Sequence, residues 1–184
     1  TVTFTYKDQE TPVIEQEAVF QNDRQKVEVS VVKKDAETQA TVPGTVFGLY
    51  AKEDILAHGE VLVKADTLIS KALSDENGKA VFMNDLPFGR YYIREEAAPD
   101  GYVSSDKVVE VTAEYQGQGI PVVELSSEYE NEPTKISVKK TDLTTGVELE
   151  GAKLTVLDKD GNMVDSWTSV KGEEHLIERL TVGE

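Results

Sequence analysis

The sequence predicts an all-β protein made of tandem β-sandwich repeats. Two observations support this: apolar and polar residues alternate along many short runs, and long segments resemble one another at a fixed offset. In the clearest run, Val27, Val29 and Val31 alternate with Glu28 and Ser30. Such period-2 alternation is typical of a strand with one buried face.

Turn-forming residues separate these runs. The clearest turns are expected at 76–78 (ENG), 99–101 (PDG) and 160–162 (DGN), since Asn-Gly and Asp-Gly favour tight turns. Helical periodicity is weak, and the stretch 53–64 is expected to form one turn of helix or a long loop. Many short strands separated by turns indicate an all-β sandwich.

Internal similarity defines the repeats. SVVKKDAETQATVPGTVFGLY matches SVKKTDLTTGVELEGAKLTVL and aligns Lys33 with Lys140, an offset of 140 − 33 = 107. TPVIEQEAVFQND matches IPVVELSSEYENE and aligns Asn22 with Asn131, an offset of 131 − 22 = 109. SDENGKAVF also resembles LDKDGNMVD.

Three divisions of the chain follow from these offsets. Residues 1–23 are expected to be the C-terminal strands of a preceding repeat, 24–133 a complete sandwich, and 134–184 the N-terminal half of a following repeat. The linkers 23–25 and 132–134 are short and lack Gly/Ser tracts, which predicts a stiff rod.

Composition excludes several classes of partner. The net charge of −16 disfavours nucleic acid and anionic membranes, and no apolar run approaches the ~20 residues of a membrane span. The absence of cysteine excludes disulfides and thiolate metal sites. We expect no metal and no cofactor, with His58 and His175 as ordinary histidines. The 158–162 segment is expected to be a hairpin turn rather than a calcium loop.

Three polar residues fall in register with apolar strand faces. Lys33 continues the face of Val31, Glu95 the face of Ile93, and Asn131 the face of Tyr129. Buried together, they must satisfy one another. Desolvation would lower the pKa of the lysine and raise that of the glutamate, giving a neutral nucleophile and a proton shuttle for attack on the asparagine amide. The alternative is that all three lie at solvated strand ends, and register alone leaves both open.

Three segments of the chain resemble one family. VSVVKKDAETQATVPGTVFGLY, YYIREEAAPDGY and VELSSEYENEP resemble the opening, the Y-x-L-x-E-T-x-A-P-x-G-Y box and the last strand of Cna-B/SpaA-type domains of Gram-positive surface proteins. The resemblance implies Ig-like/prealbumin-like sandwiches and an intramolecular isopeptide bond between Lys33 and Asn131, with Glu95 as the catalytic acid.

The sequence departs from the family pattern at four positions. Gln39 replaces Gly, Thr45 replaces Ala, Ile93 replaces Leu and Glu96 replaces Thr, while the three reactive positions are intact. An altered local charge at Glu96 is the departure closest to the expected site.

The partial repeats contain unpaired equivalents of the reactive residues. Asn22 resembles the acceptor of the preceding repeat and Lys140 the donor of the following one, so neither is expected to form a bond within one chain. Trp167 is expected to be a core or edge residue rather than a carbohydrate platform.

These features predict a structural stalk module of a cell-wall-anchored, extracellular adhesin on a Gram-positive bacterium, stabilised by a self-formed isopeptide bond. Its partners would be neighbouring repeats. It would not be an enzyme beyond one self-crosslinking event, because no catalytic set for turnover stands out. The alternative is an adhesive module that contacts a host matrix protein or glycan through the 53–73 segment.

Overall fold

The computed structural model describes residues 3, 5–10, 13, 24–82 and 85–180. Their regular structure consists of strands, which confirms the all-β prediction. Within these ranges, no helix has the length and apolar character needed to cross a membrane. The first nine strands are β1 (Lys26–Asp35), β2 (Val46–Ala51), β3 (Ile55–Ala57), β4 (Glu60–Val63), β5 (Leu68–Leu73), β6 (Lys79–Val81), β7 (Gly89–Ala97), β8 (Val108–Ala113) and β9 (Val122–Asn131). The last four are β10 (Lys135–Val138), β11 (Lys153–Leu157), β12 (Met163–Thr168) and β13 (His175–Glu178).

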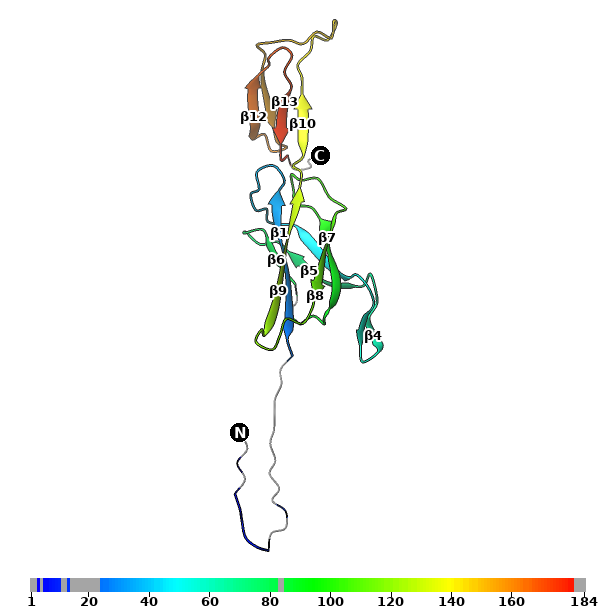
Figure 1. Ribbon diagram of the computed structural model, residues 1–184. Helices are drawn as coiled ribbons and strands as arrows, with labels where there is room; N and C mark the ends of the chain where they lie inside the picture. The colour runs from blue at the N-terminus through cyan, green and yellow to red at the C-terminus, as the bar shows by residue number, and fades with distance from the viewer. Residues whose placement is uncertain (1–2, 4, 11–12, 14–23, 83–84, 181–184) are drawn as a thin grey trace.

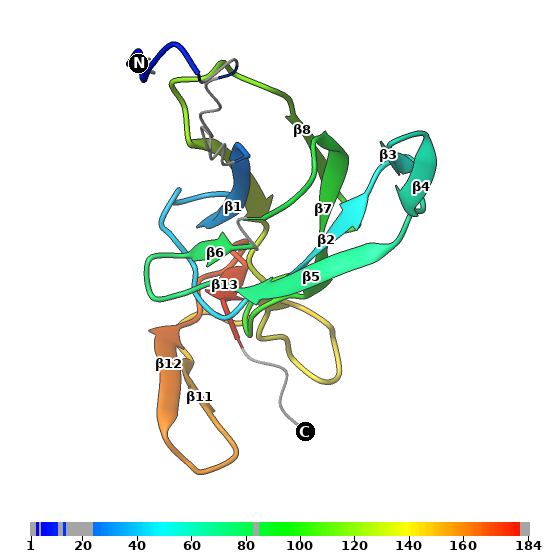
Figure 2. The same ribbon diagram turned by 90° about the horizontal axis from the view of Figure 1, so that it is seen from below.

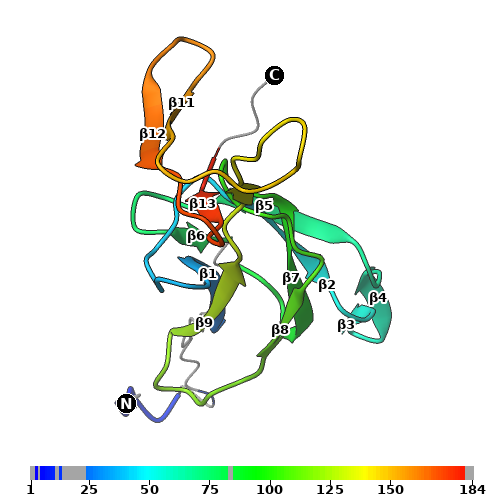
Figure 3. The same cartoon turned by 90° about the horizontal axis from the view of Figure 1, so that it is seen from above.

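Two facing sheets form a sandwich, here called the central sandwich. One sheet has the order β6-β1-β9 and the other β5-β2-β7-β8 (Figures 2 and 3). The alternation along each strand turns one set of side chains inward, as expected for strands covered on one face. Fully buried side chains of the core include Val27, Val29, Val31, Phe47, Leu49, Tyr91, Ile93, Val123 and Tyr129.

The first and last strands of the sandwich lie side by side. β1 and β9 pair in parallel over ten residues each, from Lys26 opposite Val122 to Asp35 opposite Asn131. Because the strands are parallel, their C-terminal ends meet at the same end of the sheet. Residues almost 100 positions apart in sequence therefore become neighbours there.

The 53–64 stretch forms strands, so the prediction of a helical turn or long loop is wrong. β3 and β4 make an antiparallel hairpin that projects from the central sandwich (Figure 1). Ile55 anchors it over Gly89 and is 3% exposed, whereas Leu56 and Leu62 are largely exposed. Short strands held mainly by one buried anchor leave little helical or alternating signal in the sequence.

The 53–73 segment is only partly an addition to the fold. Its last part is β5, which pairs with β2 in the four-stranded sheet, and β12 pairs with β11 in the same way. The feature without a counterpart after β11 is therefore the β3–β4 hairpin alone.

Side-chain contacts correct one of the sequence matches. Ser74 accepts a hydrogen bond from the Thr45 N–H (2.9 Å) and its own N–H donates to the Thr45 carbonyl. Ser169 makes the same two contacts with Ala152. The stretch after Ser169 thus corresponds to the stretch after Ser74, and the match of SDENGKAVF with LDKDGNMVD is wrong.

The two segments resemble each other in sequence because both contain the same local turn. Asp75 Oδ1 accepts the N–H groups of Asn77 and Lys79, and Asp158 Oδ1 accepts those of Asp160 and Asn162. The predicted turns are confirmed, but one lies between β5 and β6 and the other between β11 and β12. Such aspartate turns depend on local sequence and carry no information about their place in a fold.

The strands β10–β13, here called the second unit, follow the central sandwich at one end (Figure 1). β10 pairs with β13 and β11 with β12, both antiparallel. Only residues 132–134 connect β9 to β10. The predicted boundaries of the three divisions stay predictions, and most of 1–23 lies outside the described residues.

Candidate functional site

Three buried polar side chains lie at one end of the central sandwich. Lys33 comes from β1, Glu95 from β7 and Asn131 from β9, and they are 0%, 8% and 2% exposed. Each follows the inward-facing register of its strand, without an intervening bulge in the β1–β9 pair. The alternation predicted in the sequence therefore points these side chains inward rather than to solvent.

Glu95 and Asn131 contact each other directly. Asn131 Nδ2 donates to Glu95 Oε2 (2.6 Å) and to the Val103 carbonyl (2.9 Å), and the Ser105 N–H donates to Glu95 Oε1 (3.0 Å). Among the described residues, Asn131 Oδ1 is buried and has no hydrogen-bond donor. An asparagine kept only for structure would normally have both ends of its amide satisfied.

Burial shapes the chemistry of Lys33. Loss of solvent lowers the pKa of its amine, and this outweighs the opposing carboxylates, of which Glu95 and Asp35 are the strongest. Its Nζ donates to the Lys34 carbonyl (2.8 Å) and lies 5.1 Å from the centre of the Tyr102 ring. A buried amine with a lowered pKa loses its proton more readily and becomes a nucleophile.

Gly78 supports the backbone of Lys33 from the neighbouring turn. The Lys33 N–H donates to the Gly78 carbonyl (2.8 Å), and a Cβ on Gly78 would lie 2.7 Å from the Lys33 carbonyl oxygen. The φ of Gly78 is +73°, in the left-handed region. A larger residue would therefore be strained and would also displace Lys33.

We expect Gly78→Ala to lower the free energy of unfolding by about 2–4 kcal/mol, because backbone strain and a steric clash add. Gly59→Ala is the matched control, since Gly59 also has positive φ (+84°) but no atom within 4 Å of the added Cβ. Its expected cost is about 1 kcal/mol. Thermal and denaturant unfolding of both variants would test this, and equal losses would contradict the role given to Gly78.

Glu96, the family departure beside Glu95, points to the opposite face of the sheet. Its Oε1 accepts hydrogen bonds from the Tyr50 hydroxyl (2.7 Å) and from Arg94 Nη2 (2.8 Å), and Lys71 lies 3.1 Å from Oε2. The hydrogen bonds from Tyr50 and Arg94 lower the pKa of Glu96 to about 2. The additional charge is therefore held on the outer surface, away from Lys33.

The lowered pKa of Glu96 predicts that its carboxylate stabilises the fold above pH 4.5, the pKa expected in the unfolded chain. This stabilisation is lost as the pH falls towards 2. Glu96→Gln should reduce the free energy of unfolding by roughly 1 kcal/mol at pH 7, as expected for a partly exposed network. The difference from the native protein should shrink between pH 4.5 and pH 2. Denaturant unfolding at several pH values measures it, and a constant difference would contradict the assignment.

The other residues singled out in the sequence lie outside this cluster. Lys140 is exposed beyond the end of β10, and Asn22 lies outside the described residues. His175 stacks on Trp167 with ring centres 4.0 Å apart and its Nε2 is 2.6 Å from Asp165 Oδ2. Over the described ranges, no group of His, Asp and Glu is arranged to hold a metal ion.

Two charged residues near the site were not identified from the sequence. Asp35 is 1% exposed and interacts with Arg179, which lies 144 positions further along the chain. Asp35 continues the alternation of buried residues formed by Val31 and Lys33. This pattern could have identified Asp35 as a buried residue from the sequence. No comparable pattern marks Arg179, because its partner is brought to it only by the packing of the second unit.

Comparison with protein families gives one match. The model of the SpaA family, described as a prealbumin-like fold domain, matches residues 27–128 and again 134–184. No curated protein sequence matches the chain significantly.

Several solved structures resemble the chain. The Bacillus anthracis TIE protein is 21% identical, with a TM-score of 0.56 over 86% of this chain and 27% of that one. The full-length major pilin SpaD from Corynebacterium diphtheriae is 20% identical, with a TM-score of 0.47 over 67% of this chain and 34% of that one. A variant of the major pilin subunit of Bacillus cereus is 21% identical, with a TM-score of 0.47 over 73% and 34%. The chain spans about a third or less of the length of these three proteins.

Proposed function

Because the chain belongs to the SpaA family of prealbumin-like fold domains, we propose that it is a structural stalk module of a bacterial surface protein, locked by a Lys33–Asn131 isopeptide bond. The observation that carries the proposal is the burial of an amine, a carboxyl group and a carboxamide at one end of a sandwich. Three such groups are costly to bury unless they satisfy or react with one another.

The geometry supports a direct condensation. In the proposed step, Lys33 Nζ attacks Asn131 Cγ after it has lost its proton, which the lowered pKa of the amine favours, and the electron pair of the carbonyl moves onto Oδ1. Glu95, 2.6 Å from Nδ2, carries the proton released by the lysine nitrogen to the leaving nitrogen. The new C–N bond forms as the old one breaks, and one molecule of ammonia leaves. No oxidant, metal or co-substrate is needed.

The parallel pairing of β1 and β9 favours this product. Asp35 lies opposite Asn131 and Lys33 lies opposite Tyr129, so the lysine and the asparagine are two positions apart along the paired strands. Both strands are fixed by the same sheet before any bond forms. Fixing the two strands in advance favours the reaction, because positioning the reacting groups lowers the entropic cost of bringing them together.

A covalent link here would close a loop of about 100 residues. By analogy with a disulfide, this constrains the unfolded chain and stabilises the fold by on the order of 4–5 kcal/mol. A module stabilised in this way, repeated along a chain, suits a stiff stalk on the outer surface of a Gram-positive cell. Its immediate partners would be neighbouring repeats.

Intact mass spectrometry tests the bond. One crosslink predicts a mass about 17 Da below that calculated from the sequence, equal to one ammonia. Proteolysis should give one branched peptide joining the segments around Lys33 and Asn131. An unmodified mass would remove the crosslink from the proposal and leave a non-covalent β-sandwich module.

A second function is favoured by the β3–β4 hairpin. Leu56, Val61 and Leu62 are 61%, 48% and 58% exposed on a part of the molecule that projects from the sandwich. Exposed apolar groups gathered on one projection are typical of an interaction surface. Loss of binding to host matrix proteins or glycans when residues 56–62 are replaced by a short turn would support an adhesive role, and unchanged binding would oppose it.

A further inference from the structure

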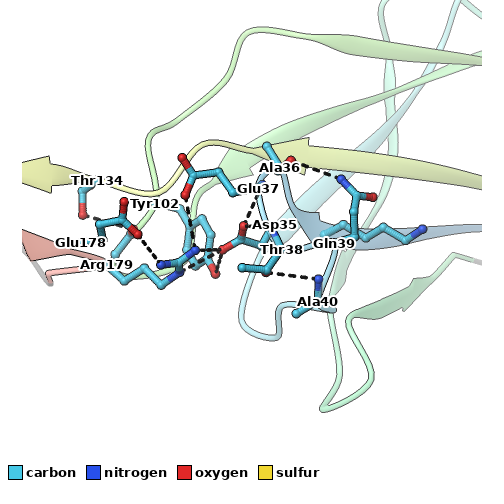
Figure 4. Close-up of polar contacts among 12 residues, drawn as sticks. Asp35, Ala36, Glu37, Thr38, Gln39, Ala40, Tyr102, Thr134, Glu178 and Arg179 are labelled. Carbon is cyan, nitrogen blue, oxygen red and sulfur yellow. Dashed lines mark hydrogen bonds and ion pairs between the residues drawn. The ribbon is translucent and has the colours of Figure 1, made fainter. Parts of the chain in front are cut away.

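We propose that Arg179 and Asp35 form a clamp that fixes the orientation of the second unit relative to the central sandwich. This inference goes beyond the proposed function and does not require the crosslink. It assigns a role to the ion pair between the buried carboxylate of Asp35 and the partly exposed Arg179, which joins the two parts of the chain beside the linker 132–134 (Figure 4).

Asp35 is the centre of the contact. Its Oδ1 accepts the N–H groups of Glu37 and Thr38, both at 2.9 Å, which forms a turn after β1. Its Oδ2 accepts the Tyr102 hydroxyl (3.0 Å) and Arg179 Nε (3.0 Å), and Arg179 Nη2 lies 2.8 Å away. One carboxylate oxygen thus builds the turn and the other binds the second unit.

The carboxylate of Asp35 is held in its charged form. Burial alone would raise its pKa, but the hydrogen bonds from Thr38, Arg179, Glu37 and Tyr102 together lower it. A buried aspartate that stays ionised requires a counterion, and Arg179 supplies it.

The backbone positions Arg179 for this contact. It follows β13 directly and has a φ of +58°, an uncommon conformation for a residue with a side chain. Its N–H donates to the Thr134 carbonyl (2.9 Å), and Arg179 Nη1 contacts Glu178 Oε2 (2.8 Å). The arginine is therefore fixed at both its main chain and its guanidinium group.

The loop after β7 completes the junction. The Thr134 N–H and hydroxyl both donate to the Gly101 carbonyl, at 2.9 and 3.1 Å. A Cβ on Gly101, whose φ is +83°, would lie 2.8 Å from the Arg179 carbonyl oxygen. The linker, this loop and the end of β13 thus pack at close range around the Asp35–Arg179 pair.

The turn by itself does not explain the arginine. In the second unit, Asp142 Oδ1 accepts the N–H groups of Thr144 and Thr145, the same pattern as at Asp35. An aspartate at this position therefore stabilises the following turn in both units. The clamp is the additional contact of Asp35 with Arg179. A substitution of Arg179 removes this contact but leaves the turn intact, so it separates the two roles of Asp35.

Distance measurements between the two parts test the clamp. The chain has no cysteine, so Glu76→Cys and Lys159→Cys introduce unique sites for spin labels on exposed turns, one in each part. We expect one narrow distance distribution in the otherwise native protein. Arg179→Gln should widen it at least twofold, because the linker, its hydrogen bonds to Gly101 and the partly exposed Lys135–Glu37 ion pair then hold the orientation without the contact to Asp35.

Arg90→Gln is the control variant. Arg90 makes ion pairs with Glu53 and Glu110 on the outer surface of the central sandwich, and its loss should leave the distribution unchanged. Asp35→Asn should widen the distribution as Arg179→Gln does, but it also weakens the turn. Arg179→Gln is therefore the decisive variant for the clamp, and circular dichroism confirms that it is folded.

A distribution that stays narrow in Arg179→Gln, or one that is already broad in the native protein, overturns the proposal. The measurement is repeated in a Glu95→Gln background, where a narrow distribution is again expected. The mass of each sample reports the crosslink separately, so failure of the clamp and failure of the crosslink are distinguishable.

Discussion

Glu95→Gln is expected to keep the full mass calculated from the sequence and to lower the melting temperature of the central sandwich by about 20 °C. Glutamine preserves the size of the side chain and can still accept one hydrogen bond, so the site should stay assembled. It cannot carry a proton from the lysine nitrogen to Asn131 Nδ2, which lies 2.6 Å from Glu95 Oε2 in the native protein. The condensation should therefore stop before ammonia leaves.

The size of the effect follows from the loop that the bond would close. About 100 residues between Lys33 and Asn131 gain conformational freedom in the unfolded state when the link is missing. The disulfide analogy puts the loss of stability on the order of 4–5 kcal/mol. For a domain of this size, each kcal/mol corresponds to roughly 4–8 °C in melting temperature.

Glu96→Gln is the matched control, because Glu96 is the adjacent residue and faces the opposite side of β7. It should retain the mass deficit and lose only the small stability of the outer network. Mass spectrometry and calorimetry on the two variants give the comparison. A Glu95→Gln protein that still lacks about 17 Da would show that another group moves the proton.

Much of the central sandwich could be predicted from local sequence. The alternation of Val27, Val29 and Val31 extends without interruption to Lys33, so one period fixes both the strand and the inward direction of the amine. The same holds for Glu95 after Ile93. A side-chain period of two is a strong signal wherever one face is buried and no bulge intervenes.

Features that depend on long-range packing could not be predicted in this way. The Asp75 and Asp158 turns have the same local hydrogen bonds but different places in the fold, which only the partners of Ser74 and Ser169 distinguish. The Asp35–Arg179 contact joins positions 144 residues apart. Nothing near Arg179 in sequence indicates its partner, because the contact is created by how two folded parts meet.

Stretching single molecules should show the largest difference between crosslinked and uncrosslinked protein. If the proposed bond is present, force that enters at Lys26 will pass along β1 to Lys33, cross the bond to Asn131 and leave through the linker to β10. That path is already an extended strand, so it can lengthen very little. We expect no extension from the central sandwich in the native protein, up to forces that break the attachments.

Glu95→Gln should instead release the segment between Lys33 and Asn131 in one step, a gain in contour length of roughly 300 Å. Without the bond, the ends of the sandwich pull β1 and β9 in opposite directions, because the strands are parallel and force enters one at its start and leaves the other at its end. The pair is then loaded in shear and resists only until its hydrogen bonds break together. Extension of the second unit should be the same in both proteins and serves as an internal reference. A release of similar length in the native protein would mean that tension passes through the folded strands rather than through a covalent link.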